Sequence, residues 1–309
     1  SLCAEIGRNY VELRGFQRLL EVTRLRLEMQ RQVAEIVLVR ADAGVASDLD
    51  ALRADAQVSS SRSELPALEA QIATRVHRLS ILLGLETRAL AGELGQSAPI
   101  PVAAAALALA QPTDLLRRRP DLRRAERECA ATSARIGVAA ASAYPRLSLG
   151  ASFGWIANEL GDLAQGSALA TTLGPSLSVP IFHSGLNAAR VEAATAREQQ
   201  AVLAFREAVL QAAGEVEDAL ATLAGATEQR AALREAVAAQ TRASKIAREL
   251  YSGGIADFLT VLDAERELFA LEDKLTRADI DVAVEFIALA KALGGGWDAT
   301  QTEGVAATR

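Results

Sequence analysis

One stretch of this sequence occurs twice, with a constant offset and no insertion. Residues 44–84 match residues 254–294, so each residue has a counterpart 210 positions further along. The two copies are identical at positions 44, 46, 49, 52, 54, 65, 73, 79, 83 and 84. A repeat of this length indicates two equivalent structural units in tandem. We therefore expect a molecule built from two similar units, each with a glycine-containing turn at the start of the repeat.

The composition favours long helices. Half of the 309 residues are hydrophobic, but only 4% are aromatic. Alanine is abundant, and it is the best helix former with a side chain small enough for close helix packing. Such a composition suits helices packed side by side better than a thick globular core. A net charge of −6 argues against a nucleic-acid partner, because no basic surface gathers along the chain.

Hydrophobic periodicity predicts where these helices lie. Residues 1–41 form a heptad-like seam, which is typical of helices packed nearly parallel over many turns. The seam consists of Ile6, Leu13, Leu20, Leu27 and Ala34, with Phe16 and Val37 at the companion position. Further helices are predicted over residues 47–83, 121–143, 184–251 and 257–293. Pro66 should kink or locally break the second of them, and Gly84 should end it.

After residue 145 the hydrophobic period changes from helical spacing to two. Two runs of about ten residues alternate apolar with small or polar residues, and this is the length of a tilted strand across a bilayer. The residues expected in membrane strands are Leu147, Leu149, Phe153, Trp155, Leu177, Val179 and Ile181. A hairpin in a soluble protein is the alternative, but Pro175 and Pro180 would be awkward in a central strand.

These patterns together predict the fold class and the order of segments. The fold is mainly α, with long antiparallel coiled-coil-like helices, one β-hairpin and a tandem pseudo-repeat. The predicted segments are a first helical hairpin over 1–84, a linker over 85–120, a helix over 121–145, the β-hairpin over 146–183, a second helical hairpin over 184–294 and a disordered tail over 295–309.

The first residues of the sequence indicate a fragment of a longer protein. The sequence opens within a helix, without a signal peptide, and residues equivalent to 146–210 would precede residue 1. Glu5 corresponds to Glu215, so Cys3 lies inside a helix and is not expected to carry a lipid. In the intact protein we expect a signal peptide, a lipidated cysteine and a first strand hairpin upstream.

Enzymatic chemistry finds no support in the sequence. Cys3 and Cys129 lack the spacing of a disulfide framework or a metal site. His77 and His183 are the only histidines, and neither has a carboxylate or cysteine at ligand spacing. Nucleophile-elbow, phosphate-loop and dinucleotide-binding motifs are also missing. We expect no cofactor, no metal and no catalytic residue.

Several linked motifs resemble the outer-membrane efflux channel family. They are Arg117-Arg118-Arg119-Pro120-Asp121, Ala134-Arg135-Ile136-Gly137-Val138, Tyr144-Pro145-Arg146-Leu147-Ser148-Leu149 and Pro180-Ile181-Phe182. The resemblance covers nearly all of residues 1–297 and is nearest to the NodT-type lipoprotein group of TolC-like proteins. It implies a homotrimeric hollow cylinder in which a twelve-stranded β-barrel in outer-membrane lipid continues into a periplasmic α-helical barrel. The implied partners are a periplasmic adaptor protein and an inner-membrane pump of the resistance-nodulation-division type.

The chain departs from the family pattern at three places. It has one strand hairpin where the family has two, and His183-Ser184-Gly185 follows Pro180-Ile181-Phe182 where the family usually has Asp or Asn and paired glycines. In members of this family the helical turns at the periplasmic end often carry a pair of aspartates. Here Asp263 occupies one of the two positions, and Thr260 occupies the other.

The resemblance places two candidate sites at the helical turns. A ring of carboxylates around a narrow bore would favour cations and hold the tip closed. The candidate gate residues are Asp263, Asp257, Asp48, Asp50 and Leu259. The candidate adaptor-docking residues are Gly44, Val45, Gly253, Gly254 and Ile255. The alternatives are helix capping for Asp257 and Asp48, core packing for Phe258 and Leu259, and simple turn chemistry for the glycines.

The favoured function is a passive outer-membrane channel of a tripartite efflux system that exports small molecules. A periplasmic coiled-coil adaptor or scaffold without a channel is the alternative, because adaptor hairpins also bind a partner end-on. The β-hairpin favours the channel.

Overall fold

The computed structural model describes residues 2–101, 119–156, 169–182 and 184–295. They form two compact units, which are described separately. Unit 1 comprises residues 1–118 and 212–309, and unit 2 comprises residues 119–211. Residues 296–309 of the expected tail and residues 102–118 of the expected linker lie outside the described residues.

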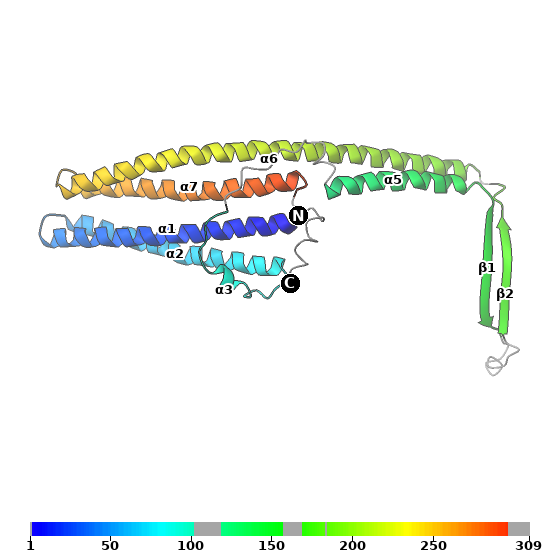
Figure 1. Cartoon of the computed structure of the whole chain (residues 1–309), viewed down its shortest axis with the longest axis horizontal. Coiled ribbons are helices and arrows are strands. Elements are labelled where there is room, and N and C mark those ends of the chain that lie inside the picture. Colours follow the sequence, from blue (N-terminus) through cyan, green and yellow to red (C-terminus); the bar gives the residue numbers. More distant parts are fainter. Residues whose placement is uncertain (1, 102–118, 157–168, 183, 296–309) are drawn as a thin grey trace, which may run out of the picture. The chain divides into compact units, whose positions relative to one another are not determined.

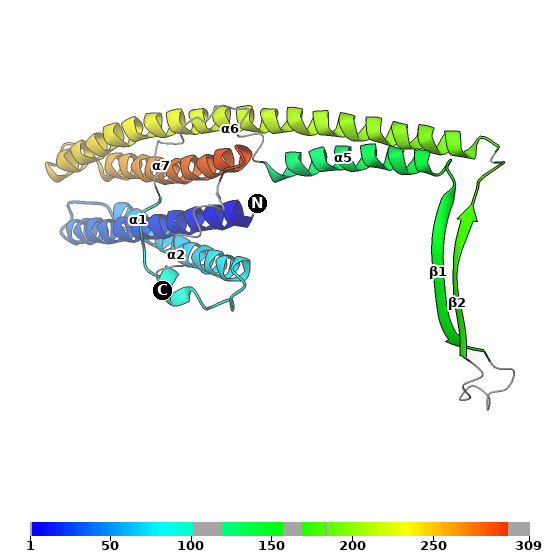
Figure 2. The ribbon, with the colours of Figure 1, turned by 45° about the vertical axis from the view of Figure 1, so that its right-hand side comes forward.

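Unit 1 is built from two antiparallel helical hairpins (Figure 1). The first consists of α1 (Leu2–Asp42) and α2 (Asp48–Leu82), followed by the short helix α3 (Ala91–Leu94). The second consists of the C-terminal part of α6 (Leu186–Ser252) and α7 (Phe258–Ala292). Figures 1 and 2 both show α1 beside α7, and these two helices carry the contact between the hairpins.

The repeat is reproduced in the backbone of the two turns. Gly44 and Gly254 have φ of +71° and +73°, a conformation that glycine adopts without a steric penalty. The amide of Gly44 donates to Ala41 O at 2.8 Å, and the amide of Gly254 donates to Tyr251 O at 3.0 Å. Each turn has the paired hydrogen bonds of a Schellman motif. The two hairpins are therefore structurally equivalent at their turns.

Three apolar clusters hold unit 1 together. The first joins all four long helices near the turns, and its buried residues are Val37, Ala54, Ala247, Phe258, Val261 and Leu262. The second lies between α1 and α2 and consists of Leu13, Val76 and Leu79. The third lies between α6 and α7 and consists of Ala219, Leu289, Ala292 and Leu293. Apolar packing is thus concentrated at the two ends of the hairpins.

Two glycines let α1 approach α7 closely. A Cβ atom on Gly15 would lie 2.2 Å from Ile280 Cδ1, and one on Gly7 would lie 3.2 Å from Ile287 Cδ1. Contacts below 3 Å do not occur without displacement of one of the partners. The isoleucines of α7 therefore occupy space that the missing side chains of α1 leave free.

Unit 2 contains a helix, a strand hairpin and the first part of α6. Helix α5 (Pro120–Ala141) begins with proline in its first turn, where the missing amide hydrogen costs no helical bond. Ser142 Oγ donates to Asn187 Oδ1 at 3.4 Å, and Cys129 Sγ donates to Ala201 O at 3.2 Å. These contacts join α5 to α6.

The strands β1 (Arg146–Trp155) and β2 (Leu169–Ser178) form an antiparallel pair. Apolar residues face each other across one side of the pair, as in Leu147 opposite Leu177 and Ala151 opposite Leu173. Small residues form the other side, with Ser148 opposite Ser176, Gly150 opposite Gly174 and Ser152 opposite Thr172. Because side chains alternate between the faces of a strand, the register separates an apolar face from a small, uncharged one.

The predicted fold class, mainly α with one β-hairpin, is confirmed. One detail of the sequence prediction is wrong. Val179 and Ile181 lie beyond β2, because β1 begins at Arg146 and its partner Ser178 ends the ladder. Pro66 lies inside α2, as predicted, and it removes one hydrogen bond of the helix without ending it. Among the described residues, no helix combines the length and the apolar character that a membrane span requires.

Replacing Gly15 by alanine should destabilise unit 1 by about 1–3 kcal/mol, because the new methyl group overlaps Ile280. Chemical denaturation measures this change. Gly225→Ala is the matched control, since a Cβ there meets no atom within 4 Å. In an Ile280→Ala background the cost of Gly15→Ala should disappear. An equal cost in both backgrounds would contradict the proposed close contact.

Candidate functional site

The two helical turns expose matching apolar side chains. Val45 and Ile255 are equivalent in the repeat and are 73% and 79% exposed. Their amides donate to Arg40 O at 2.8 Å and to Leu250 O at 2.9 Å, so the backbone fixes both side chains in the same position of the turn. Gly44, Gly253 and Gly254 are exposed beside them. Each turn thus presents one apolar side chain on a rigid loop, and the docking role of these residues stays a prediction.

Helix caps explain two polar residues at the turns. Ser47 caps α2: its Oγ accepts from Asp50 N at 3.2 Å and donates to Asp50 Oδ2 at 3.0 Å. Asp257 caps α7 by accepting from Thr260 N at 3.0 Å and from Thr260 Oγ1 at 2.7 Å. These hydrogen bonds from Thr260 hold the pKa of Asp257 below its usual value. Capping, which the sequence offered as an alternative for Asp257, is therefore observed, whereas at the first turn the cap is Ser47 and not Asp48.

The remaining gate candidates are Asp48, Asp50, Asp263 and Leu259, and Asp50 is half-buried. Phe258, next to Leu259, is only 3% exposed and packs in the apolar cluster at the turns, as the sequence analysis allowed for it. Leu259 is 39% exposed, and Asp48 and Asp263 are exposed. Only the exposed positions are available for a gate, and their role there stays a prediction.

Arg40 joins the two turns and was not identified from the sequence. Its Nη1 and Nη2 donate to Tyr251 O at 3.3 Å and to Ser252 O at 3.2 Å. Its guanidinium also lies 4.8 Å from the centroid of the Tyr251 ring. The last carbonyl groups of a helix lack intrahelical partners and attract cations. Arg40 therefore ties the end of α1 to the end of α6.

A second arginine, Arg53, lies among the acids of both turns. It is 3.8 Å from Asp50, and its charge contributes to lowering the pKa of Asp257. In the repeat, Arg53 corresponds to Asp263 and Arg40 corresponds to Leu250. The sequence signal for both arginines was therefore a cation in the first copy at a position where the second copy has an acid or an apolar residue.

An ion pair between a buried acid and a partly exposed arginine lies within the second hairpin. Glu265 of α7 is 6% exposed, and its Oε1 lies 2.9 Å from Arg248 Nε of α6. Burial raises the pKa of Glu265, and the attraction by Arg248 only partly offsets this effect. The folded state therefore binds a proton at Glu265 more tightly than the unfolded chain, and stability falls as the pH rises through the raised pKa.

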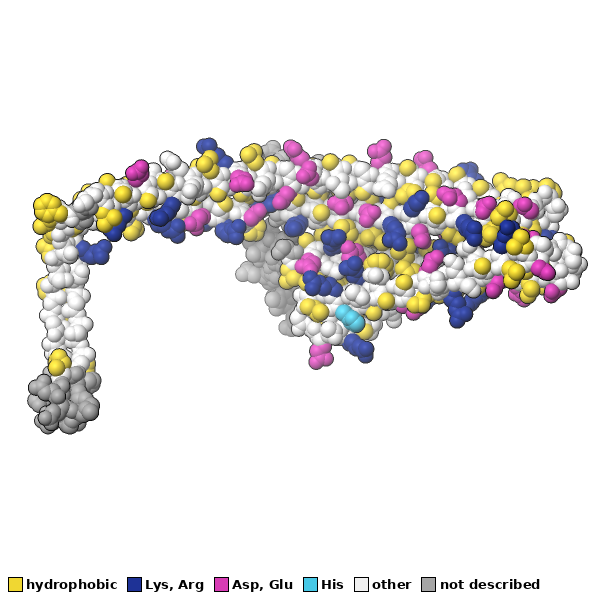
Figure 3. Space-filling view, turned by 180° about the vertical axis from the view of Figure 1, so that it is seen from behind, with side chains coloured by type: hydrophobic (Ala, Val, Ile, Leu, Met, Phe, Trp, Pro, Cys, Tyr) yellow, Lys and Arg dark blue, Asp and Glu magenta, His cyan; other side chains and the backbone are white. Residues whose placement is uncertain are grey.

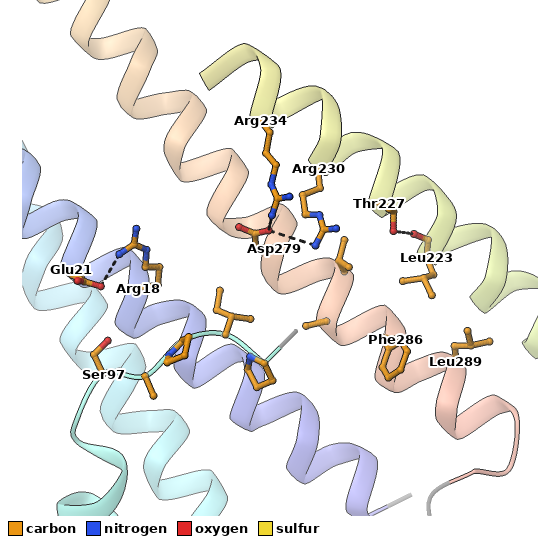
Figure 4. Close-up of a pocket in the computed structure, with 16 residues that line it drawn as sticks. Arg18, Glu21, Ser97, Leu223, Thr227, Arg230, Arg234, Asp279, Phe286 and Leu289 are labelled. Atoms are coloured by element: carbon orange, nitrogen blue, oxygen red, sulfur yellow. Dashed lines mark hydrogen bonds and ion pairs between the residues drawn. The ribbon is translucent and has the colours of Figure 1, made fainter. Parts of the chain in front are cut away.

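A half-open groove of about 1000 Å³ lies in unit 1 beside residues 97–101 (Figure 4). Asp279 of α7 points toward Arg230 and Arg234 of α6, at 3.9 Å and 3.5 Å. Arg18 of α1 pairs with Glu21 at 2.9 Å. Every charged side chain that lines the groove is thus in an ion pair, but Arg230 and Arg234 share the carboxylate of Asp279, so the lining has one positive charge in excess. In the part of the chain that the structure describes, no cluster of metal-ligating side chains occurs.

The strand hairpin exposes its apolar face. Leu147, Leu149, Phe153, Leu173 and Leu177 are each between 66% and 75% exposed. Residues 147–155 and 169–178 contain no acidic or basic residue. Figure 3 shows the hairpin without a charged side chain beyond its base. An apolar face of this size on an uncharged hairpin marks a surface that is covered in the working protein.

Comparison with known proteins identifies the family. Residues 1–85 and 112–295 match the outer membrane efflux protein family. The chain belongs to this family. The predicted family and the predicted outer-membrane location are therefore confirmed.

The solvent efflux pump outer membrane protein SrpC of Pseudomonas putida is 32% identical over 97% of the chain and 64% of its own length. Outer membrane protein OprJ of Pseudomonas aeruginosa is 33% identical over 96% of the chain and 62% of its own length. The solved structure of the outer-membrane channel OprN has a TM-score of 0.83 and 35% identity, over 96% of the chain and 66% of that structure. The chain thus spans slightly less than two thirds of these relatives. None of these names describes an enzyme.

Replacing Ser47 tests whether its side chain stabilises the start of α2. Ser47→Ala should destabilise unit 1 by about 1 kcal/mol, because the amide of Asp50 at the start of α2 loses its side-chain acceptor. Denaturant unfolding measures the loss, and Ser47→Asp should restore it. Ser59→Ala, at an exposed position inside α2, is the control and should have almost no effect. A Ser47→Ala variant as stable as the Ser59→Ala variant would refute the cap.

Proposed function

We propose that the protein is the passive outer-membrane channel of a tripartite efflux system. In this proposal three copies surround one bore, the strand hairpins contribute to a β-barrel in lipid, and the helical hairpins extend the bore into the periplasm. Substrates are small molecules delivered by an inner-membrane pump of the resistance-nodulation-division type. The protein performs no chemistry on them.

The exposed apolar face of the β-hairpin carries this proposal. An exposed apolar face with five large side chains is unfavourable in water, at roughly 25 cal/mol for each Å² of exposed apolar surface. Lipid removes this cost on one side of the hairpin, while the small polar side chains on the other suit a hydrated interior. A two-stranded hairpin also leaves one edge of each strand unpaired, and barrel closure satisfies those edges. Family membership supports the channel against the alternative of an adaptor without a channel.

The turns supply the proposed gate and docking surface. Val45 and Ile255 are rigidly held apolar contacts for a periplasmic adaptor. Asp263 and Leu259 face solvent and narrow the bore where symmetry brings three copies together. Arg40 holds the two turns of each copy together and so keeps this end of the bore closed.

A charge on the apolar face should prevent membrane assembly. Leu149→Arg places a cation at the middle of β1, at a cost of about 2–4 kcal/mol for a lipid-facing position. We expect this variant to be lost from the outer-membrane fraction of cells. Ser148→Arg, on the opposite face of the same strand, is the matched control and should assemble. Equal assembly of the two variants would show that this face does not meet lipid.

Single-channel recording tests the gate. The protein purified from outer membranes should conduct ions in planar bilayers, and Asp263→Ala should raise the leak by removing a negative ring. Arg40→Gln should raise the leak as well, because the two turns lose their connection. Asp218→Ala, at an exposed position of α6 far along the helix from its turn, is the control. Unchanged leak in Asp263→Ala would remove this residue from the gate, and absence of conductance in every variant would refute the channel.

A further inference from the structure

A single arginine lies at the base of the strand hairpin. Arg146 is the first residue of β1 and pairs with Ser178, the last residue of β2, where the hairpin joins the helices. It is the only charged residue of the two strands. Residues 157–168 between the strands, which include Glu159 and Asp162, lie outside the described residues. The side chain of Arg146 is exposed and makes no ion pair or hydrogen bond with another described residue, so it is a free cation.

The strand register places Arg146 on the small, polar face of the hairpin. Side chains alternate between the two faces of a strand, so Arg146 shares its face with Ser148 and Ser152 of β1. Across the pair, the same face continues with Ser178 and Ser176 of β2. In the proposed channel this is the face that lines the bore, whereas the opposite, apolar face meets lipid. Arg146 therefore belongs to the lining of the bore.

The adjoining ends of α5 and α6 do not neutralise this charge. From residue 129 to residue 191, the described part of the chain contains three arginines and no acidic residue. Arg135 is paired with Glu128 at 3.0 Å, whereas Arg146 and Arg190 have no such partner among the described residues. Figure 3 shows cationic side chains where the hairpin joins the helices. The junction thus carries a net positive charge.

The proposed trimer brings three copies of this charge around one passage. A narrow passage lined by charges of one sign attracts ions of the opposite sign, and rings of arginine or lysine suit pores for anions. We propose that the three Arg146 side chains form a cationic ring at the base of the β-barrel, which favours the passage of anionic small molecules. This inference rests on the proposed channel and assigns a charge class to its substrates.

The proposed gate has to be open for this ring to be measured. The carboxylates proposed for the gate would favour cations and would hide the preference of the ring. Asp263→Ala removes the acid proposed to close the turns and is expected to conduct. The ion preference that remains in this variant reflects the rest of the bore, and it serves as the background for the following variants.

Reversal potentials in a potassium chloride gradient test the ring. The protein purified from outer membranes, with Asp263→Ala, should prefer chloride. Arg146→Gln should lower the ratio of chloride to potassium permeability by about threefold at 0.1 M salt, where the Debye length is about 10 Å. At 1 M salt, where that length is about 3 Å, the difference should be nearly lost, because salt screens a charge but not a change of shape. Arg146→Lys should keep the preference.

The residue opposite Arg146 supplies a variant that leaves the arginine in place. Ser178→Glu sets a carboxylate beside Arg146 across the strand pair, and it should lower the permeability ratio as Arg146→Gln does. Ser178→Gln has the same size without the charge and should leave the ratio unchanged. The ring is refuted if Arg146→Gln conducts with an unchanged ratio, or if Ser178→Glu and Ser178→Gln behave alike. Absence of conductance in every variant would refute the channel itself, and the ring with it.

Discussion

The close approach of α1 and α7 is the contact on which unit 1 depends. Each helical hairpin has its own apolar cluster, but an antiparallel pair of helices does not by itself form a stable body. Gly15 and Gly7 bring the backbone of α1 near enough to α7 for Ile280 and Ile287 to fill the space between them. This contact joins the two hairpins along their length.

The two hairpins have the same backbone conformation at their turns but different charged side chains around them. Their turns share the same φ angles and the same hydrogen bonds, because glycine at the same position imposes them. The side chains around the turns are different. Arg40 and Arg53 occur only in the first copy, whereas Tyr251 and Asp263 occur only in the second. The two hairpins thus share one backbone arrangement at their turns, and Arg40, which occurs in one copy only, adds a polar contact to the apolar contacts between them.

Much of this architecture could be predicted from the sequence. Heptad spacing and alanine content located the long helices within one or two residues at nearly every end, and Gly44 and Gly254 located the turns. The burial of polar residues could not be predicted. Thr23, Arg26 and Gln30 interrupt the apolar seam of α1, and their burial depends on α2 and α7, which pack against them from distant parts of the chain. The predicted end of β2 was wrong because a strand ends where its partner strand ends. β1 begins at Arg146, which pairs with Ser178, so β1 has no residue that pairs with Val179.

The central claim is that the apolar face of the hairpin meets lipid while the two turns of each copy surround a common bore. The most direct measurement is the structure of the protein in lipid nanodiscs by electron cryomicroscopy. We expect three copies around one axis, with Leu147, Leu149 and Phe153 toward the lipid and the turns at Gly44 and Gly254 together at the far end of the bore. A single copy whose hairpin packs with that face against its own helices, without a bore, would contradict it.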